Sequence, residues 1–179
     1  MDRYVIDPWV SHQYKDYKKL RDEFGIEPFD FQISELKGIF TRGVIFGHRG
    51  FQSVYNAIRN GKKFTILTGL MPSGKMHLGH KLVIDQMINY QKIGAKGYIA
   101  VADLEAYATR NISLEKGYEI AIRDYVPNYL ALGVDPQKTQ VYFQSKRKSV
   151  IDLALLFQRR INLNEMKEIY GFKDDSNLL

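Results

Sequence analysis

Two histidines, His77 and His80, stand where a glycine-rich turn passes into a predicted helix. Their spacing of three places both rings on one face of that helix. The N-terminus of a helix attracts phosphate through its free N–H groups and its dipole, and imidazoles there can donate hydrogen bonds to phosphate oxygens. Lys75 adds a positive charge, and Gly79 leaves bare backbone against which a flat base can lie. These residues therefore predict a site for a nucleotide phosphate.

The same turn also fits a second kind of phosphate site. Residues 69–75 match the P-loop pattern G-x-x-x-x-G-K, and Asp103 mimics the acidic strand end that helps such proteins hold magnesium. However, Met76 stands where Ser or Thr should bind the metal, and Pro72 removes a backbone N–H that the loop would need. We therefore favour the histidine site over a P-loop.

Polar side chains also follow the next two predicted strands. Asp103 and Glu105 come after the apolar run 98–102, and Gln144 follows the run 140–143. Two carboxylates this close in sequence could form a metal site or an acid–base pair. No histidine or further carboxylate accompanies them as a ligand, so we predict no dedicated metal site.

The elements that must position these residues alternate between strand and helix. This alternation predicts an α/β fold with a Rossmann-like parallel sheet, whose ligands bind at the carboxyl ends of the strands. Ser113 and Ser149 are predicted helix caps, and Pro127 is predicted to kink or break its helix. Tyr125 and Tyr129 share one helix face and are predicted core residues. The predicted strands are 64–68, 98–102 and 140–143, and the predicted helices are 77–93, 114–132, 150–160 and 164–170.

The first 62 residues follow no such regular pattern. We predict an N-terminal α+β extension over 1–62, and the Rossmann-like part over 63–179. Within the extension, helices are expected at 14–24 and 51–60 and a strand at 43–46.

Composition narrows the class of protein. The 179 residues are 45% hydrophobic and 26% charged, which excludes a disordered or collagen-like chain, and no apolar run is long enough to span a membrane. The absence of cysteine excludes disulfides, zinc–thiolate sites and thiol nucleophiles. With no secretory signal at the start, these features predict a cytoplasmic protein without membrane contact. A net charge of +6 is a weak indication of a polyanionic partner.

The histidine segment carries a family resemblance. The stretch PSGKMHLGH at 72–80 closely resembles the His-x-Gly-His signature of class I aminoacyl-tRNA synthetases, in the form used by the tyrosyl and tryptophanyl subclass. DPW at 7–9, RGVIFGHR at 42–49 and IYGF at 169–172 are similar to motifs of the archaeal and eukaryotic tryptophanyl type. The resemblance covers essentially the whole chain. It implies the first βαβαβ half of the class I catalytic domain, preceded by a hairpin that folds over the ATP site.

The resemblance also implies a two-step reaction. The carboxylate of tryptophan attacks the α-phosphate of ATP, with Mg²⁺ sharing the charge, and the activated acyl group then passes to tRNA(Trp). His77, His80 and Lys75 would act on the phosphates as catalytic residues. The other ATP-binding residues implied are Thr68, Gly69, Pro72, Ser73, Gly74 and Gly79, with His48, Arg49 and Gln52 from the hairpin.

The amino-acid pocket implied by the family includes Leu67, Asp103, Glu105 and Gln144. A carboxylate such as Glu105 suits the indole N–H, which can only donate. The chain departs from the family pattern at Gly50, where an acidic residue is usual. Leu67 and Ala100 replace a tyrosine and a glutamine of eukaryotic relatives, and these two departures keep tyrosine open as a substrate.

Nothing in the chain matches the second signature of the subclass, Lys-Met-Ser-Lys-Ser, or its anticodon-binding domain. The resemblance is therefore to the N-terminal half of an enzyme that is a homodimer at full length. We expect the isolated 179 residues to be inactive or severely impaired. Two alternatives stay open, namely a fragment of a tyrosyl-tRNA synthetase and a non-catalytic nucleotide- or RNA-binding module on the same half-fold.

Overall fold

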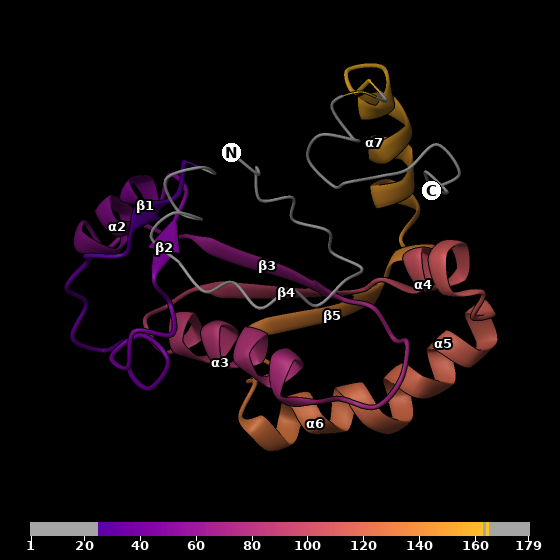
Figure 1. Cartoon of the computed structure of the whole chain (residues 1–179), viewed down its shortest axis with the longest axis horizontal. Helices are drawn as coiled ribbons and strands as arrows, with labels where there is room; N and C mark the ends of the chain where they lie inside the picture. The colour runs from indigo at the N-terminus through magenta and orange to yellow at the C-terminus, as the bar shows by residue number, and fades with distance from the viewer. Residues whose placement is uncertain (1–24, 163, 165–179) are drawn as a thin grey trace, which may run out of the picture.

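A three-stranded parallel sheet lies at the centre of the protein (Figure 1). The computed structural model describes residues 25–162 and 164, so the predicted helix at 14–24 and nearly all of that at 164–170 fall outside the described part. The strands are, in spatial order, β3 (Thr65–Leu70), β4 (Lys96–Val101) and β5 (Thr139–Phe143). The three predicted strands and their parallel, Rossmann-like arrangement are confirmed.

Helices connect and flank these strands. They are α2 (Gln52–Arg59), α3 (Leu78–Lys92), α4 (Asp103–Arg110), α5 (Leu114–Ile120), α6 (Val126–Leu132) and α7 (Lys148–Gln158), with a π-helical turn η1 (Ala121–Tyr125) and a 3₁₀ turn η2 (Gln144–Lys146). The sequence did not predict α4. None of the helices formed by the described residues has the length and hydropathy needed to cross a membrane.

The strand register brings the three carboxyl ends to one edge of the sheet. Leu70 of β3 aligns with Val101 of β4, which aligns with Phe143 of β5. The central strand β4 is buried from Ile99 to its end, as expected for an apolar run that other elements cover on both sides. The residues that follow each strand are therefore neighbours in space.

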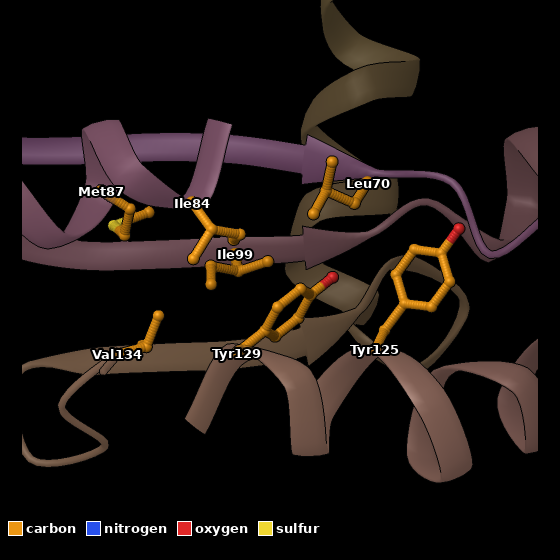
Figure 2. Close-up of a cluster of buried hydrophobic side chains, with 7 residues drawn as sticks. All are labelled: Leu70, Ile84, Met87, Ile99, Tyr125, Tyr129 and Val134. Carbon is orange, nitrogen blue, oxygen red and sulfur yellow. The ribbon is translucent and has the colours of Figure 1, made fainter. Parts of the chain in front are cut away.

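Helices α3 and α6 bury one face of the sheet in a cluster that Figure 2 shows in close-up. Each aliphatic side chain that is fully buried in this way stabilises the fold by about 1.5–3 kcal/mol. Tyr125 and Tyr129 are 0% and 1% exposed, which confirms their assignment to the core. The members of the cluster are Leu70, Ile84, Met87, Ile99, Tyr125, Tyr129 and Val134.

The predicted helix at 114–132 is widened rather than broken. It runs through α5, η1 and α6, and in η1 the Val126 N–H donates to Ala121 O, five residues back. Pro127 has no N–H to donate, and its ring would clash with the carbonyl four residues before it in a regular α-helix. A π-helical turn just before the proline relieves this conflict.

The two predicted serine caps have different outcomes. Ser113 Oγ accepts a hydrogen bond from Lys116 N at 3.2 Å, so this cap is confirmed. Ser149 is not a cap, because α7 starts one residue earlier, directly after η2, with Arg147 in the N-cap position.

The N-terminal part forms a short hairpin in which β1 (Glu27–Pro28) pairs antiparallel with β2 (Gly47–His48). Helix α2 confirms the helix predicted at 51–60. The strand predicted at 43–46 is wrong, because Gly43 has a φ of 69° and belongs to a turn, and the strand starts only after it.

This hairpin region packs against the C-terminal end of α3. Lys37 N donates to Asn89 Oδ1 at 2.9 Å. The rings of Phe40 and Phe51 have centroids 5.4 and 6.0 Å from that of Tyr90. The N-terminal region is thus attached to the end of α3 that is remote from His77.

Candidate active site

The connection from β3 to α3, residues 71–77, carries the predicted phosphate site (Figure 1). Pro72 is fully buried, whereas residues 73–75 are exposed. Hydrogen bonds from η1 hold the connection near both ends, at Met71 and at Met76. We call residues 71–80 the histidine turn. Its exposed residues 73–75 lie between the two fixed residues, Met71 and Met76, and can contact a ligand.

The two histidines form the N-terminal cap of α3 with their own backbone. His77 is the N-cap residue, and its Nδ1 accepts a hydrogen bond from Gly79 N at 3.1 Å. His80 Nδ1 accepts from His77 N at 3.2 Å, and the two ring centroids are 3.9 Å apart. A Cβ atom at Gly79 would lie 3.0 Å from His77 Cε1, so a side chain there would require the His77 ring to move by a few tenths of an ångström. The His-x-Gly-His spacing is therefore a structural unit.

This arrangement assigns the proton on each neutral ring. A nitrogen that accepts a hydrogen bond from a backbone N–H carries no proton, so the proton lies on Nε2 of both rings. Burial, and then the nearby His77, lower the pKa of His80, while the carboxylate of Asp124 acts in the opposite direction. The lowered pKa favours the neutral form of His80, and the pair offers two Nε2–H donors at the positive end of the α3 dipole.

The carboxyl ends of β4 and β5 are joined by a buried carboxylate. Asp103 is 2% exposed, and its Oδ1 accepts hydrogen bonds from Leu104 N and Ser145 N, both at 3.1 Å. Its Oδ2 accepts a short hydrogen bond from Ser145 Oγ. Asp103 therefore ties the residue after Gln144 to the start of α4, on which Glu105 is exposed.

The predicted residues of β3 divide between the two faces of the sheet. Ile66 packs against the core under α3, and side chains alternate along a strand, so Thr68 shares this face. Leu67 and Gly69 lie on the opposite face, where the Leu67 side chain is 67% exposed. Only this second face leaves β3 side chains accessible to a ligand.

The structure does not bring the hairpin residues to the histidine turn. The His48 side chain is 9% exposed and packs on Phe29, Phe31 and Phe51, and the predicted ATP contacts Arg49 and Gln52 lie beside it in the chain. These rings adjoin the end of α3 at residue 90, about 15 Å along the helix from residue 80. The closure of the hairpin over ATP therefore stays a prediction.

Residues 59–178 match the family described as tRNA synthetases class I (W and Y). The chain belongs to this family. It is 47% identical over 176 residues to the tryptophan–tRNA ligase of Methanocaldococcus jannaschii, covering 97% of this chain and 48% of that protein. It is 48% identical over 175 residues to the tryptophan–tRNA ligase of Thermoplasma volcanium, covering 98% and 40%.

Solved structures agree with this assignment of the synthetase fold. The crystal structure of tryptophanyl-tRNA synthetase from Aeropyrum pernix has a TM-score of 0.78 and 41% identity, over 94% of this chain and 48% of that chain. The tryptophan-bound enzyme from Encephalitozoon cuniculi also gives a TM-score of 0.78, at 27% identity, over 91% and 51%. The synthetase chain thus spans about half the length of the relatives it matches.

Sequence reasoning missed three residues that support the site of this synthetase chain. Asp124 and Tyr125 hold the two ends of the histidine turn, and Ser145 binds the Asp103 carboxylate. Pro127 could have pointed to Asp124 and Tyr125, because a proline inside a helix distorts the helical turn that precedes it. Ser145 follows a strand end, which is where a parallel sheet gathers functional residues.

The described residues contain no group of three or more His, Asp or Glu side chains that could hold a metal ion. Both carboxylate oxygens of Asp103, the best-placed acid, already accept hydrogen bonds. A hollow of about 640 Å³ lies elsewhere, beside Phe29, Phe31 and Phe40, and no predicted site residue lines it.

Proposed function

We propose that the protein activates tryptophan with ATP and transfers it to tRNA(Trp), as a tryptophan–tRNA ligase. The histidine turn carries this proposal, because it places two Nε2–H donors, Lys75 and a helix N-terminus at the carboxyl edge of the sheet. The similarity to tryptophan–tRNA ligases over nearly the whole chain supports tryptophan as the amino acid. Synthesis of aminoacyl-tRNA serves translation, so we assign the protein to the cytoplasm.

In the first step, a carboxylate oxygen of tryptophan forms a bond to the α-phosphorus of ATP. The bond from that phosphorus to the bridging oxygen breaks, and pyrophosphate leaves with the electron pair. Negative charge grows on the phosphate oxygens, where the Nε2–H groups of His77 and His80 and the ammonium of Lys75 stabilise it. We propose that Mg²⁺ enters on the ATP phosphates, where it neutralises charge, rather than on a site built by this chain.

In the second step, a ribose hydroxyl of the terminal adenosine of the tRNA forms an ester bond to the activated carbonyl carbon and loses its proton. The bond from that carbon to the phosphate oxygen breaks, and AMP leaves with the electron pair. No side chain becomes acylated or phosphorylated. The chain has no cysteine, and the reaction needs only groups that orient the substrates and stabilise charge.

The carboxyl ends of β4 and β5 are proposed to face the amino acid. The exposed Glu105 carboxylate provides an acceptor for a tryptophan N–H group, and Gln144 begins η2, whose next residue, Ser145, is bound to Asp103. Asp103 acts through its neighbours, since its oxygens are used within the protein. Leu67, with Gly69 and Ala100 paired across the strands, completes an apolar wall.

Tryptophan-dependent exchange of pyrophosphate into ATP tests the function directly. We expect the protein of the complete open reading frame to catalyse exchange with tryptophan and to discriminate strongly against tyrosine. Exchange with tyrosine alone would show a tyrosyl enzyme. Binding of ATP or RNA without exchange with either amino acid would show a non-catalytic module.

We further propose that the full-length protein is a homodimer. Helix α7 exposes the apolar side chains Leu153, Leu155, Leu156 and Phe157, at 51% to 65% of their surface. A helix that is apolar on several sides is normally covered by other protein, which supports an additional protein surface over α7, and we propose a second copy of the chain as that surface. Sedimentation equilibrium of the full-length protein should give twice the chain mass, and the mass of one chain would contradict the proposal.

A further inference from the structure

The histidine turn is held by two consecutive residues of another element. Asp124 and Tyr125 end the π-helical turn η1, and each binds a different end of the turn. The bound atoms belong to Met71 and Met76, which flank the exposed residues 73–75. Because π-turns within α-helices are frequent at functional sites, this pairing calls for an explanation beyond the packing of the core.

Asp124 fixes the end nearest the histidines. Its Oδ2 accepts a hydrogen bond of 2.7 Å from the N–H of Met76, the residue that precedes His77. Its Oδ1 accepts from Asn128 Nδ2 at 3.1 Å, and the same Nδ2 donates to Asp124 O at 2.7 Å. The carboxylate is therefore oriented by its own helix before it reaches the turn.

Tyr125 fixes the other end and also touches a histidine. Its Oη donates to Met71 O at 3.0 Å, and its ring stands edge-on to His80 with centroids 5.3 Å apart. In Figure 2 its hydroxyl points at the segment that leaves β3 after Leu70. Since Tyr125 is fully buried in the core, it transmits the rigidity of the core to this segment.

We propose that Asp124 and Tyr125 are positioning residues for adenylate formation, which hold the histidine turn at Met76 and Met71 so that His77 and His80 meet the phosphates. The kinetic part of this proposal rests on the proposed function. Catalysis by positioned donors is sensitive to small displacements, and a shift of about 1 Å can cost about 100-fold in rate. Pro127 supports this arrangement, because the π-helical turn that precedes it places Asp124 and Tyr125 against the histidine turn.

The test compares matched pairs of variants in the protein of the complete open reading frame. Asp124→Ala removes the acceptor of the Met76 N–H, together with the Asn128 contact within its own helix, and Tyr125→Phe removes the donor to Met71 O. Asp124→Asn keeps an acceptor for Met76 N–H. Glu119→Gln is the charge control, because Glu119 is exposed and pairs only with Lys116 and Arg123 among the described residues. Tyr129→Phe is the hydroxyl control, because Tyr129 Oη is buried with no hydrogen-bond partner in the described part of the chain.

Two quantities are measured. In tryptophan-dependent exchange, Asp124→Ala and Tyr125→Phe should lower kcat about 10- to 100-fold while the KM for tryptophan stays within about twofold. Asp124→Asn should recover most of that loss, and both controls should match the wild type. Independently of activity, hydrogen exchange of the Met76 amide should be at least about 10-fold faster in Asp124→Ala than in wild type.

Each outcome has a defined meaning. A wild-type protein without exchange activity would refute the proposed function, while the Met76 amide would still show whether Asp124 holds the turn. Unchanged Met76 exchange in Asp124→Ala would overturn the positioning role. Losses in the controls Glu119→Gln and Tyr129→Phe equal to those in Asp124→Ala and Tyr125→Phe would also overturn it, because the effect would then be a general one on the helix.

Discussion

Replacement of both His77 and His80 by alanine should reduce tryptophan-dependent ATP–pyrophosphate exchange about 1000-fold. A single donor to charge that develops in a transition state is worth about 10²–10³ in kcat. The combined effect should fall short of the product of the single effects, because the His77 N–H to His80 Nδ1 hydrogen bond couples the two rings. Steady-state exchange by the full-length protein measures this directly.

Each histidine has two functions that separate substitutions can distinguish. Nδ1 caps the helix, and Nε2–H is free to donate. Asparagine provides an acceptor near the position of Nδ1 but no donor at Nε2, whereas glutamine places an amide N–H near Nε2. His77→Gln and His80→Gln should therefore keep more exchange activity than His77→Asn and His80→Asn.

The opposite order would mean that the histidines act mainly as caps of α3. Asparagine is a favourable N-cap, so thermal denaturation should show His77→Asn to be as stable as wild type within about 1 kcal/mol. Near wild-type exchange by the double alanine variant would refute the phosphate role altogether.

The sequence was a reliable guide wherever local chemistry decides the structure. The three apolar runs became β3, β4 and β5, and Ser113 became a cap, because burial of apolar strands and satisfaction of helix ends are determined by neighbouring residues. The spacing of His77 and His80 was equally predictive. It places both rings at the first turn of α3, where the backbone itself requires acceptors.

Contacts between segments that are distant in sequence could not be predicted in the same way. Asp124 lies 48 residues from Met76, and Ser145 lies 42 residues from Asp103, and no local pattern links them. Ser149 resembles an N-cap in sequence, yet the preceding 3₁₀ turn moves the start of α7 to Lys148. The packing of the His48 ring among phenylalanines near the far end of α3 is a further contact of this kind, and its predicted place over ATP stays a prediction.

Asp103→Ala should lower the free energy of unfolding by about 3 kcal/mol. The buried carboxylate accepts hydrogen bonds from Leu104 N, Ser145 N and Ser145 Oγ, and its loss would leave the Ser145 N–H without this acceptor at the carboxyl end of β5. Hydrogen bonds to a charged group are worth about 1.5–3 kcal/mol, and an unsatisfied buried donor adds its own cost. Urea unfolding followed by circular dichroism measures the change.

Glu105→Ala is the matched control, because it removes an exposed carboxylate two residues further along the same helix. Its stability should stay within about 0.5 kcal/mol of wild type, as is usual for an exposed position, while the KM for tryptophan in exchange should rise. A double-mutant cycle of Asp103→Ala with Ser145→Ala should show a coupling of about 0.5–3 kcal/mol. If Asp103→Ala were as stable as wild type and instead raised the KM for tryptophan, Asp103 would contact the amino acid, as the family resemblance implied. The two carboxylates that follow β4 would then share one task, whereas the hydrogen bonds of Asp103 point to a separate task for it, holding the strand ends, and leave the amino acid to the proposed role of Glu105.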